Sequence, residues 1–118
     1  MAESFGPDLL RGSLDLMVLS VLVSGPQYGY SIGQKLREAS GGMVAVQAGT
    51  LYPLLHRLEA DRLIRSKWDD STGRRRKWYE LTAAGRKRLQ RQARQWHDYV
   101  ECLNRILAPV LEAGPEPA

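Results

Sequence analysis

The sequence predicts a mainly helical α+β fold, in which a winged helix-turn-helix is followed by one long helix. Three helix-length segments come first, and two short β-rich segments around a loop of turn formers, Asp69 to Gly73, come next. An apolar series with heptad spacing then runs along most of the remaining chain. With 118 residues, of which 43% are hydrophobic, the chain is long enough for one domain with a modest core.

The first two predicted helices are read from caps and apolar spacing. Ser13 is the expected N-cap of the first, and the segment from Leu14 to Val23 is apolar on nearly every side. We therefore expect this helix to be buried all round, partly against a second subunit. Ser24-Gly25-Pro26 ends it. The second helix covers residues 28–39, and its core stripe is Tyr28, Ile32 and Leu36.

The third predicted helix has one apolar side and one polar side. Thr50 is its expected N-cap, which places Pro53 at the third helical position, where a missing N–H costs nothing. The inner side consists of Leu51, Leu54, Leu55 and Leu58. The outer side carries Thr50, Tyr52, His56 and Arg57.

Two strands, residues 63–68 and 77–81, form the expected hairpin, and positive charge gathers on it. Residues 62–94 hold 12 of the 17 Lys and Arg against three acids, which leaves this segment at +9. Such clustering predicts a polyanionic partner, and a membrane surface fits less well because no exposed apolar face adjoins the cations. A helix with a polar face beside a basic wing favours double-stranded DNA.

The candidate DNA contacts come from the second helix, the third helix and the wing. They are Tyr30, Thr50, Tyr52, His56, Arg57, Arg74, Arg75, Arg76 and Lys77. Strand alternation sends half of the wing cations inward or sideways, so two or three per subunit are expected to touch DNA. Tyr52 is a candidate both for DNA contact and for core packing. Tyr28 and Tyr30 are divided between a hydroxyl contact to phosphate and packing, with Tyr30 the more exposed candidate.

Thr82 begins the last predicted helix, whose apolar seam repeats at alternating spacings of four and three. A helix of about thirty residues is roughly 45 Å long, too long for one small domain to cover, so we expect it to pair with a second copy. The expected boundaries are 9–82 for the winged-helix domain and 83–111 for the dimerisation helix, with flexible termini at 1–8 and 112–118. The expected interface consists of Leu14, Met17, Leu89, Ala93, Trp96, Val100, Leu103, Leu107 and Val110.

Several functional classes find no support in the sequence. Cys102 is the one cysteine, which excludes an internal disulfide, and Met1 to Asp8 has no signal-peptide pattern, so a cytoplasmic location is expected. His56 and His97 form no ligand spacing with Cys102, so no metal or other cofactor is expected. No combination of nucleophile, base and oxyanion donors indicates an enzyme.

Four motifs in order give the chain a recognisable family character: residues 10–15, residues 25–30, residues 49–59, and residues 76–82 followed by Gly85. On these motifs the chain resembles the PadR family of bacterial transcriptional regulators, of the short type with a single C-terminal helix, over about residues 9–111. The resemblance implies a homodimeric, usually repressing, DNA-binding protein that often controls its own promoter. It also implies that the first and last helices form the dimer. One departure is Arg62, where similar proteins commonly have a Gly that permits a left-handed turn.

Trp96 has two interpretations. On the seam it is an anchor of the dimer interface; in some short members of the resembled family, such a tryptophan and its dimer mate hold flat aromatic ligands, with Tyr99 here extending the wall. Cys102 lies one position off the seam, which favours a buried or incidental thiol over a redox switch. The predicted function is a ligand-responsive repressor that binds a pseudo-palindromic operator as a homodimer. The alternative is a winged-helix dimer that binds a small molecule or docks a protein without specific operator recognition.

Overall fold

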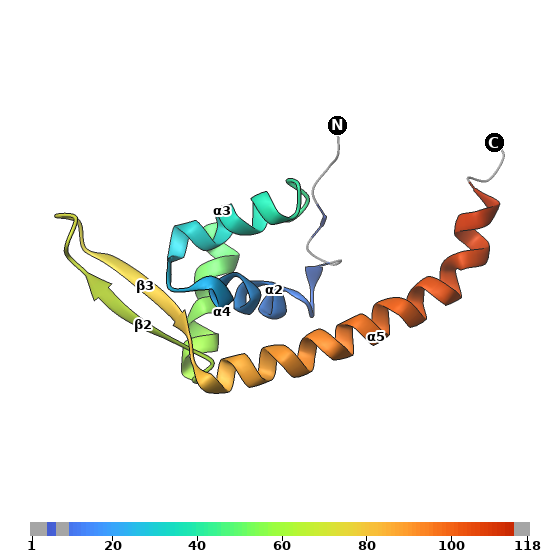
Figure 1. Ribbon diagram of the computed structural model, residues 1–118. Helices are drawn as coiled ribbons and strands as arrows, with labels where there is room; N and C mark the ends of the chain where they lie inside the picture. The colour runs from blue at the N-terminus through green and yellow to red at the C-terminus, as the bar shows by residue number, and fades with distance from the viewer. Residues whose placement is uncertain (1–4, 7–9, 115–118) are drawn as a thin grey trace.

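The structure is a computed structural model that describes residues 5–6 and 10–114 (Figure 1). Helices α2, α3 and α4 form a head, the β2–β3 hairpin projects from one side of it, and α5 projects from the other. This arrangement confirms the predicted winged helix with a long C-terminal helix. The elements in chain order are α2 (Leu14–Val21), the 3₁₀ turn η1 (Leu22–Ser24), β1 (Gln27–Tyr28), α3 (Gly29–Ala39), α4 (Ala48–Ala60), β2 (Ile64–Asp69), β3 (Arg76–Leu81) and α5 (Ala83–Ala113).

The core lies between α2, α3, α4 and the sheet. The four leucines predicted for the inner side of α4 are all at most 4% exposed, which confirms the assignment. Ile32 and Leu36 of α3 are buried as predicted, and Tyr79 contributes a fully buried aromatic ring from β3. The remaining buried apolar residues are Leu10, Val18, Leu19, Leu22, Val44, Leu63, Ile64 and Leu89.

The first helix was expected to be buried on every side, partly against a second subunit; within the single chain it is buried on one side. Within α2 only Val18 and Leu19 are buried, and the helix ends at Val21, before the predicted Val23, which is 46% exposed. The flanking positions Leu14, Leu16, Met17 and Val21 are partly buried against the core. The helix therefore packs one face on its own domain and leaves a second apolar face open.

Of the three predicted N-caps, Ser13 occupies the N-cap position of α2 without a side-chain cap bond, and Thr50 is not at the start of α4. The Ser13 hydroxyl donates to the Leu10 carbonyl and makes no cap bond. The N-cap of α4 is Gln47, whose backbone is extended at φ −80° and ψ 155°. The helix therefore starts at Ala48, before the predicted cap at Thr50. Pro53 then sits in the second turn, where its missing N–H leaves the Gly49 carbonyl without its i+4 donor. Ser and Thr favour N-caps only as a statistical preference, which neither guarantees a cap bond at Ser13 nor fixes the start of α4 at Thr50.

The predicted N-cap at Thr82 is confirmed, and the same side chain also contacts the base of the wing. Thr82 Oγ1 accepts from the Gly85 amide at 3.0 Å at the start of α5. The same hydroxyl lies 2.8 Å from the Arg62 carbonyl and 3.0 Å from the Leu63 carbonyl, to which it can donate. The Thr82 side chain thus joins the base of β2 to the first turn of α5.

The end of α4 is a Schellman motif that uses an arginine where glycine is favoured. The Leu63 amide donates to the Leu58 carbonyl and the Arg62 amide to the Glu59 carbonyl, both at 3.0 Å. Arg62 has φ 61°, and among the residues described it is the one non-glycine with positive φ. The left-handed turn that glycine would favour is therefore present in spite of the arginine side chain.

The sheet has three antiparallel strands in the order β1-β3-β2. β1 was not predicted, because a two-residue strand has no measurable alternation and Tyr28 fitted the helical spacing of α3. Gln27 pairs with Tyr79 and Tyr28 with Trp78. The hairpin ladder runs from Ile64 opposite Leu81 to Asp69 opposite Arg76.

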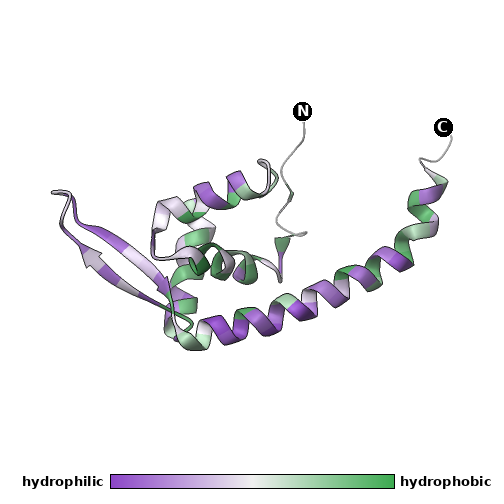
Figure 2. Cartoon of the chain, in the orientation of Figure 1, coloured by the Kyte–Doolittle hydropathy of each residue, from purple (hydrophilic) through white to green (hydrophobic). Residues whose placement is uncertain are grey.

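α5 is 31 residues long, and its C-terminal half extends beyond the head (Figure 1). Leu89 is its last buried apolar residue, and Trp96 is partly buried. Figure 2 shows hydrophobic segments recurring along the helix beyond that point. The radius of gyration is 17.1 Å, against about 13 Å for a compact chain of this length. Within the described part of the chain, no apolar surface covers the distal half of α5.

Candidate nucleic-acid interface

The outer face of α4 is defined by the four leucines that it buries. At 3.6 residues per turn, the line opposite them contains Gly49, Pro53, His56 and Ala60, all of which are exposed. His56 is therefore the predicted contact that points most directly away from the core. Thr50 is also exposed but lies on the flank that faces α2.

Tyr52 lies on the other flank of α4 and packs against the first turn of α3. A Cβ at Gly29 would be only 2.9 Å from Tyr52 Cε1 and 3.2 Å from its hydroxyl oxygen, so the ring rests on bare backbone. The side chain still leaves 38% of the residue exposed. Packing is thus one role of Tyr52, and Gly29 is needed to make room for it. Tyr30, two residues before Ile32 on α3, is 56% exposed and free of this contact.

Arg57 is tied to α2. Its Nη2 lies 2.6 Å from Asp15 Oδ1, and the arginine side chain is 59% exposed. The ion pair bridges the predicted recognition helix to the first helix of the head. Sequence reasoning missed it because the two residues are 42 positions apart and only the tertiary fold brings them together.

The four consecutive cations of the wing point in different directions. Arg74 and Arg75 are exposed in the loop, and the Arg75 guanidinium lies 4.4 Å from the centroid of the Trp68 ring. Arg76 lies 5.0 Å over the ring of Tyr28. Lys77 is on the opposite face of the strand, 3.8 Å from Glu59 of α4 and only 29% exposed. The wing tip therefore offers Arg74 and Arg75 to solvent, while Lys77 stabilises the contact between wing and α4.

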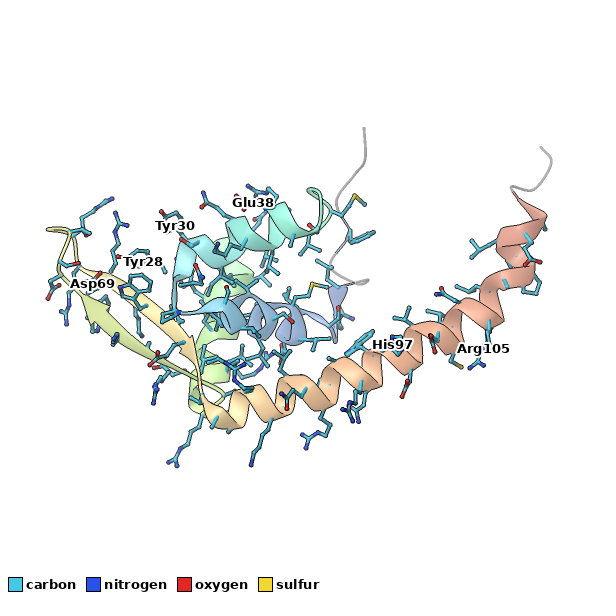
Figure 3. The ribbon with its side chains drawn as sticks, viewed as in Figure 1. Tyr28, Tyr30, Glu38, Asp69, His97 and Arg105 are labelled. Carbon is cyan, nitrogen blue, oxygen red and sulfur yellow. The ribbon has the colours of Figure 1, made fainter. Side chains whose placement is uncertain are left out.

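A group of side chains at the start of α3 and the outer end of the hairpin was not predicted; we call it the Asp69 cluster. Tyr28 and Asp69 lie next to each other on facing elements (Figure 3), and the Tyr28 hydroxyl donates to Asp69 Oδ2 at 2.8 Å. Trp78 Nε1 donates to the same oxygen at 2.8 Å, and the Ser71 amide donates to Oδ1 at 2.9 Å. The rings of Tyr28 and Trp78 are 4.0 Å apart, and Arg76 completes the cluster.

These hydrogen bonds control the ionisation of the cluster. The Trp78 indole, the Ser71 amide and hydroxyl, and the Tyr28 hydroxyl together hold the pKa of Asp69 far below its usual range. The hydrogen bond to Asp69 raises the pKa of Tyr28, with desolvation adding to the effect. The carboxylate therefore stays charged and the phenol protonated at neutral pH. No local pattern indicated this pairing, because Tyr28 fitted the core stripe of a helix.

The residues predicted for the dimer and for an effector lie along α2 and α5. Trp96 is partly buried beside the turn that precedes α2, where a Cβ at Gly12 would be 3.9 Å from its Cζ2. Its ring meets Tyr99 edge-on with centroids 5.3 Å apart, and Tyr99 is 56% exposed. Leu14 and Met17 are partly buried, and the seam residues Ala93, Val100, Leu103, Leu107 and Val110 are exposed.

The remaining singled-out residues of α5 lie on its surface. Cys102 is exposed in the single chain, so of the two expected alternatives, a buried or an incidental thiol, the thiol is not buried there. His97 lies 3.4 Å from Glu101 one turn along the helix. Within residues 5–6 and 10–114, no three His, Cys, Asp or Glu side chains come together as metal ligands would. No helix in the described part of the chain has the length and apolar character needed to cross a membrane.

A polar-faced helix next to a basic hairpin defines a winged-helix DNA-binding protein, and comparison with known proteins identifies the family. The model of the transcriptional regulator PadR-like family matches residues 18–91. An uncharacterized protein X of Lysinibacillus sphaericus is 30% identical over 98 residues, which is 82% of this chain and 90% of that protein. The chain therefore belongs to the PadR family of transcriptional regulators.

Solved structures agree with this assignment. The PadR family transcriptional regulator from Eggerthella lenta is 36% identical, with a TM-score of 0.75 over 85% of this chain and 86% of that one. A transcriptional regulator from Clostridium thermocellum is 31% identical, with a TM-score of 0.77 over 83% of this chain and 96% of that one. Membership in the family implies that the chain is a DNA-binding regulator.

Proposed function

We propose that the protein is a homodimeric repressor that binds a pseudo-palindromic operator, with the two copies of α4 in successive major grooves. The observation that carries the proposal is the exposed outer line of α4 on an element that continues directly into the basic wing. Lys77 of β3 lies 3.8 Å from Glu59 of α4, and Ser66 of β2 donates to the same carboxylate, so the inner part of the wing contacts α4. Repression would follow from occlusion of the promoter and needs no chemistry from the protein.

The distal half of α5 supports the homodimer. Six large apolar residues there are between 36% and 69% exposed: Val100, Leu103, Ile106, Leu107, Val110 and Leu111. A continuous apolar stripe of this kind on a soluble protein marks an interaction surface. A second α5, packed with the open face of α2, would cover it with the heptad spacing that pairs helices.

Trp96 and Tyr99 support a response to a planar aromatic ligand. In the proposed dimer the partly buried Trp96 would meet its mate across the two-fold axis, and the edge-on Tyr99 ring would form a side wall. A ligand there would change DNA affinity only by the difference between its affinities for the two arrangements of the dimer. Trp96→Ala should abolish the ligand response. Because Trp96 is also a predicted interface residue, the response is measured at a protein concentration at which the variant is dimeric; a full response in this variant would contradict the proposed site.

The decisive experiment compares binding to the DNA upstream of the protein's own gene with binding to scrambled DNA of the same length. A mobility shift at physiological salt, ~0.15 M, should show tight and competitor-resistant binding with two symmetric half-sites. Equal, weak binding to several candidate promoters and to scrambled DNA would contradict operator recognition. It would favour a docking or small-molecule-binding dimer instead.

Two sets of substitutions separate phosphate contacts from base contacts. Replacing Arg74 and Arg75 by Ala should weaken binding to all sequences alike. It should also lower the slope of log K against log salt by up to about 0.9 for each phosphate that is no longer neutralised. His56→Ala should instead reduce the discrimination between operator and scrambled DNA with little change in slope. An unchanged slope in the arginine variant would contradict the proposed role of the wing.

A further inference from the structure

The outer half of the wing has little backbone support. β1 pairs with β3 at only two positions, Tyr28 with Trp78 and Gln27 with Tyr79. The hairpin continues past them to the pair of Asp69 and Arg76, and beyond that pair lies the loop at residues 70–75. Two rungs of backbone pairing therefore do not by themselves fix the angle between the wing tip and the head.

The Asp69 cluster supplies the missing connection. Oδ2 of Asp69 accepts hydrogen bonds from Tyr28, the residue before α3, and from Trp78 of β3. Oδ1 accepts from the amide of Ser71 inside the loop. One carboxylate thus joins the start of α3, the third strand and the wing loop. It can do so because an ionised carboxylate accepts several hydrogen bonds at once and strengthens each of them.

We propose that Asp69 is a positioning residue for DNA binding, which holds the wing tip with Arg74 and Arg75 at a fixed place relative to the start of α3. The proposal rests on the proposed function in that both elements must grip one duplex. A wing that is already ordered avoids the entropy cost of ordering its arginines when DNA binds. Without the carboxylate, that cost is incurred during binding.

The sign of the effect distinguishes this role from ordinary electrostatics. Removing an acidic group from a surface near phosphates removes repulsion, so charge alone predicts tighter DNA binding. The positioning role predicts weaker binding from the same change. Asp70, the next residue, is a matched control: its side chain is 76% exposed, and its closest cation, Arg75, is 3.9 Å away. It takes no part in the Asp69 cluster.

The experiment measures the affinity for a fixed duplex as a function of salt for the full chain and the variants Asp69→Asn, Asp70→Asn and Tyr28→Phe. Asp69→Asn should weaken binding roughly tenfold, the cost of ordering two arginine side chains, with the salt slope unchanged because the bound complex neutralises the same phosphates. Asp70→Asn should bind as well as the parent or better. Tyr28→Phe, which deletes one donor without changing any charge, should weaken binding in the same direction as Asp69→Asn.

Amide hydrogen exchange of the DNA-free proteins provides a second measurement. Residues 70–75 should exchange faster in Asp69→Asn than in Asp70→Asn, while the head amides stay equally protected, which shows that the variant is folded. Binding of Asp69→Asn that equals or exceeds that of the parent would overturn the proposal and leave the regulator function intact. A parent chain that binds no duplex at all would overturn both.

Discussion

Replacing Gly85 with alanine should separate α5 from the base of the wing. A Cβ at Gly85 would lie 2.0 Å from the Leu63 carbonyl oxygen and 2.9 Å from both the Leu63 carbonyl carbon and Leu81 Cδ1. The nearest obstacle is backbone, which cannot rotate away as a side chain does. That same Leu63 carbonyl also accepts the Thr82 amide at 3.1 Å, so moving the helix disturbs the Thr82 contacts too.

The expected loss of stability follows from these contacts. Overpacking a tight site costs about 1–3 kcal/mol. Loss of the Thr82 cap costs about 1 kcal/mol, and each disturbed hydrogen bond about 1 kcal/mol more. A loss of about 3–5 kcal/mol in the free energy of unfolding is therefore expected, a large part of the total for a small domain.

Urea denaturation at a fixed protein concentration measures this loss, since association would otherwise change the apparent stability. Gly49→Ala is the matched control. It is also a glycine in a helix, but a Cβ there would meet nothing within 4 Å among the residues described, so it should stabilise by about 0.5–1 kcal/mol. A loss of less than about 1 kcal/mol in Gly85→Ala would refute direct seating of α5 on the Leu63 carbonyl.

Three further outcomes are expected. Arg62→Gly should raise the free energy of unfolding in urea by up to about 1 kcal/mol, because relief of the left-handed strain exceeds the added entropy of the unfolded glycine. Gly49→Ala, which adds a methyl group on the outermost line of α4, should lower operator affinity in a mobility shift without changing the salt slope. Because the native pKa of Asp69 is depressed, its stabilisation is complete above the unfolded value near 3.9 and is lost as the pH falls through the native pKa. Asp69→Asn should therefore flatten the acid limb of the melting temperature between about pH 5 and pH 2; equal acid limbs would contradict this.

Local rules predicted the parts of this fold that depend on near neighbours. The leucine spacing of α4 and the cap at Thr82 each involve residues within one or two helical turns, and both were confirmed. The predicted start of α4 was wrong because the extended backbone that precedes the helix is at Gln47, in spite of the preference of Thr50 for a cap position. The sequence did not predict β1 because two residues cannot show a periodicity. The strand also depends on pairing with β3, which lies about fifty residues later.

The candidate site likewise contains features that local rules explain and contacts that depend on distant residues. Strand alternation explains why Arg76 and Lys77 lie on opposite faces of the wing. No local pattern indicates that Arg57 pairs with Asp15 or that Tyr28 donates to Asp69, since these partners are 42 and 41 residues apart. A charged residue on a predicted recognition helix can thus also be bound within its own protein, and the sequence does not show this.

The unsupported distal half of α5 has a consequence for how the regulator would respond to its own abundance. If the functional unit is the proposed homodimer, the concentration of dimers rises with the square of the chain concentration while most chains are single. Operator occupancy would then rise more steeply than the number of chains. A gene repressed by its own dimeric product in this way would be transcribed almost fully at low protein concentration and repressed over a narrow range of higher concentrations. The exposed apolar stripe, through the affinity with which two chains associate, would then set the protein concentration at which repression begins.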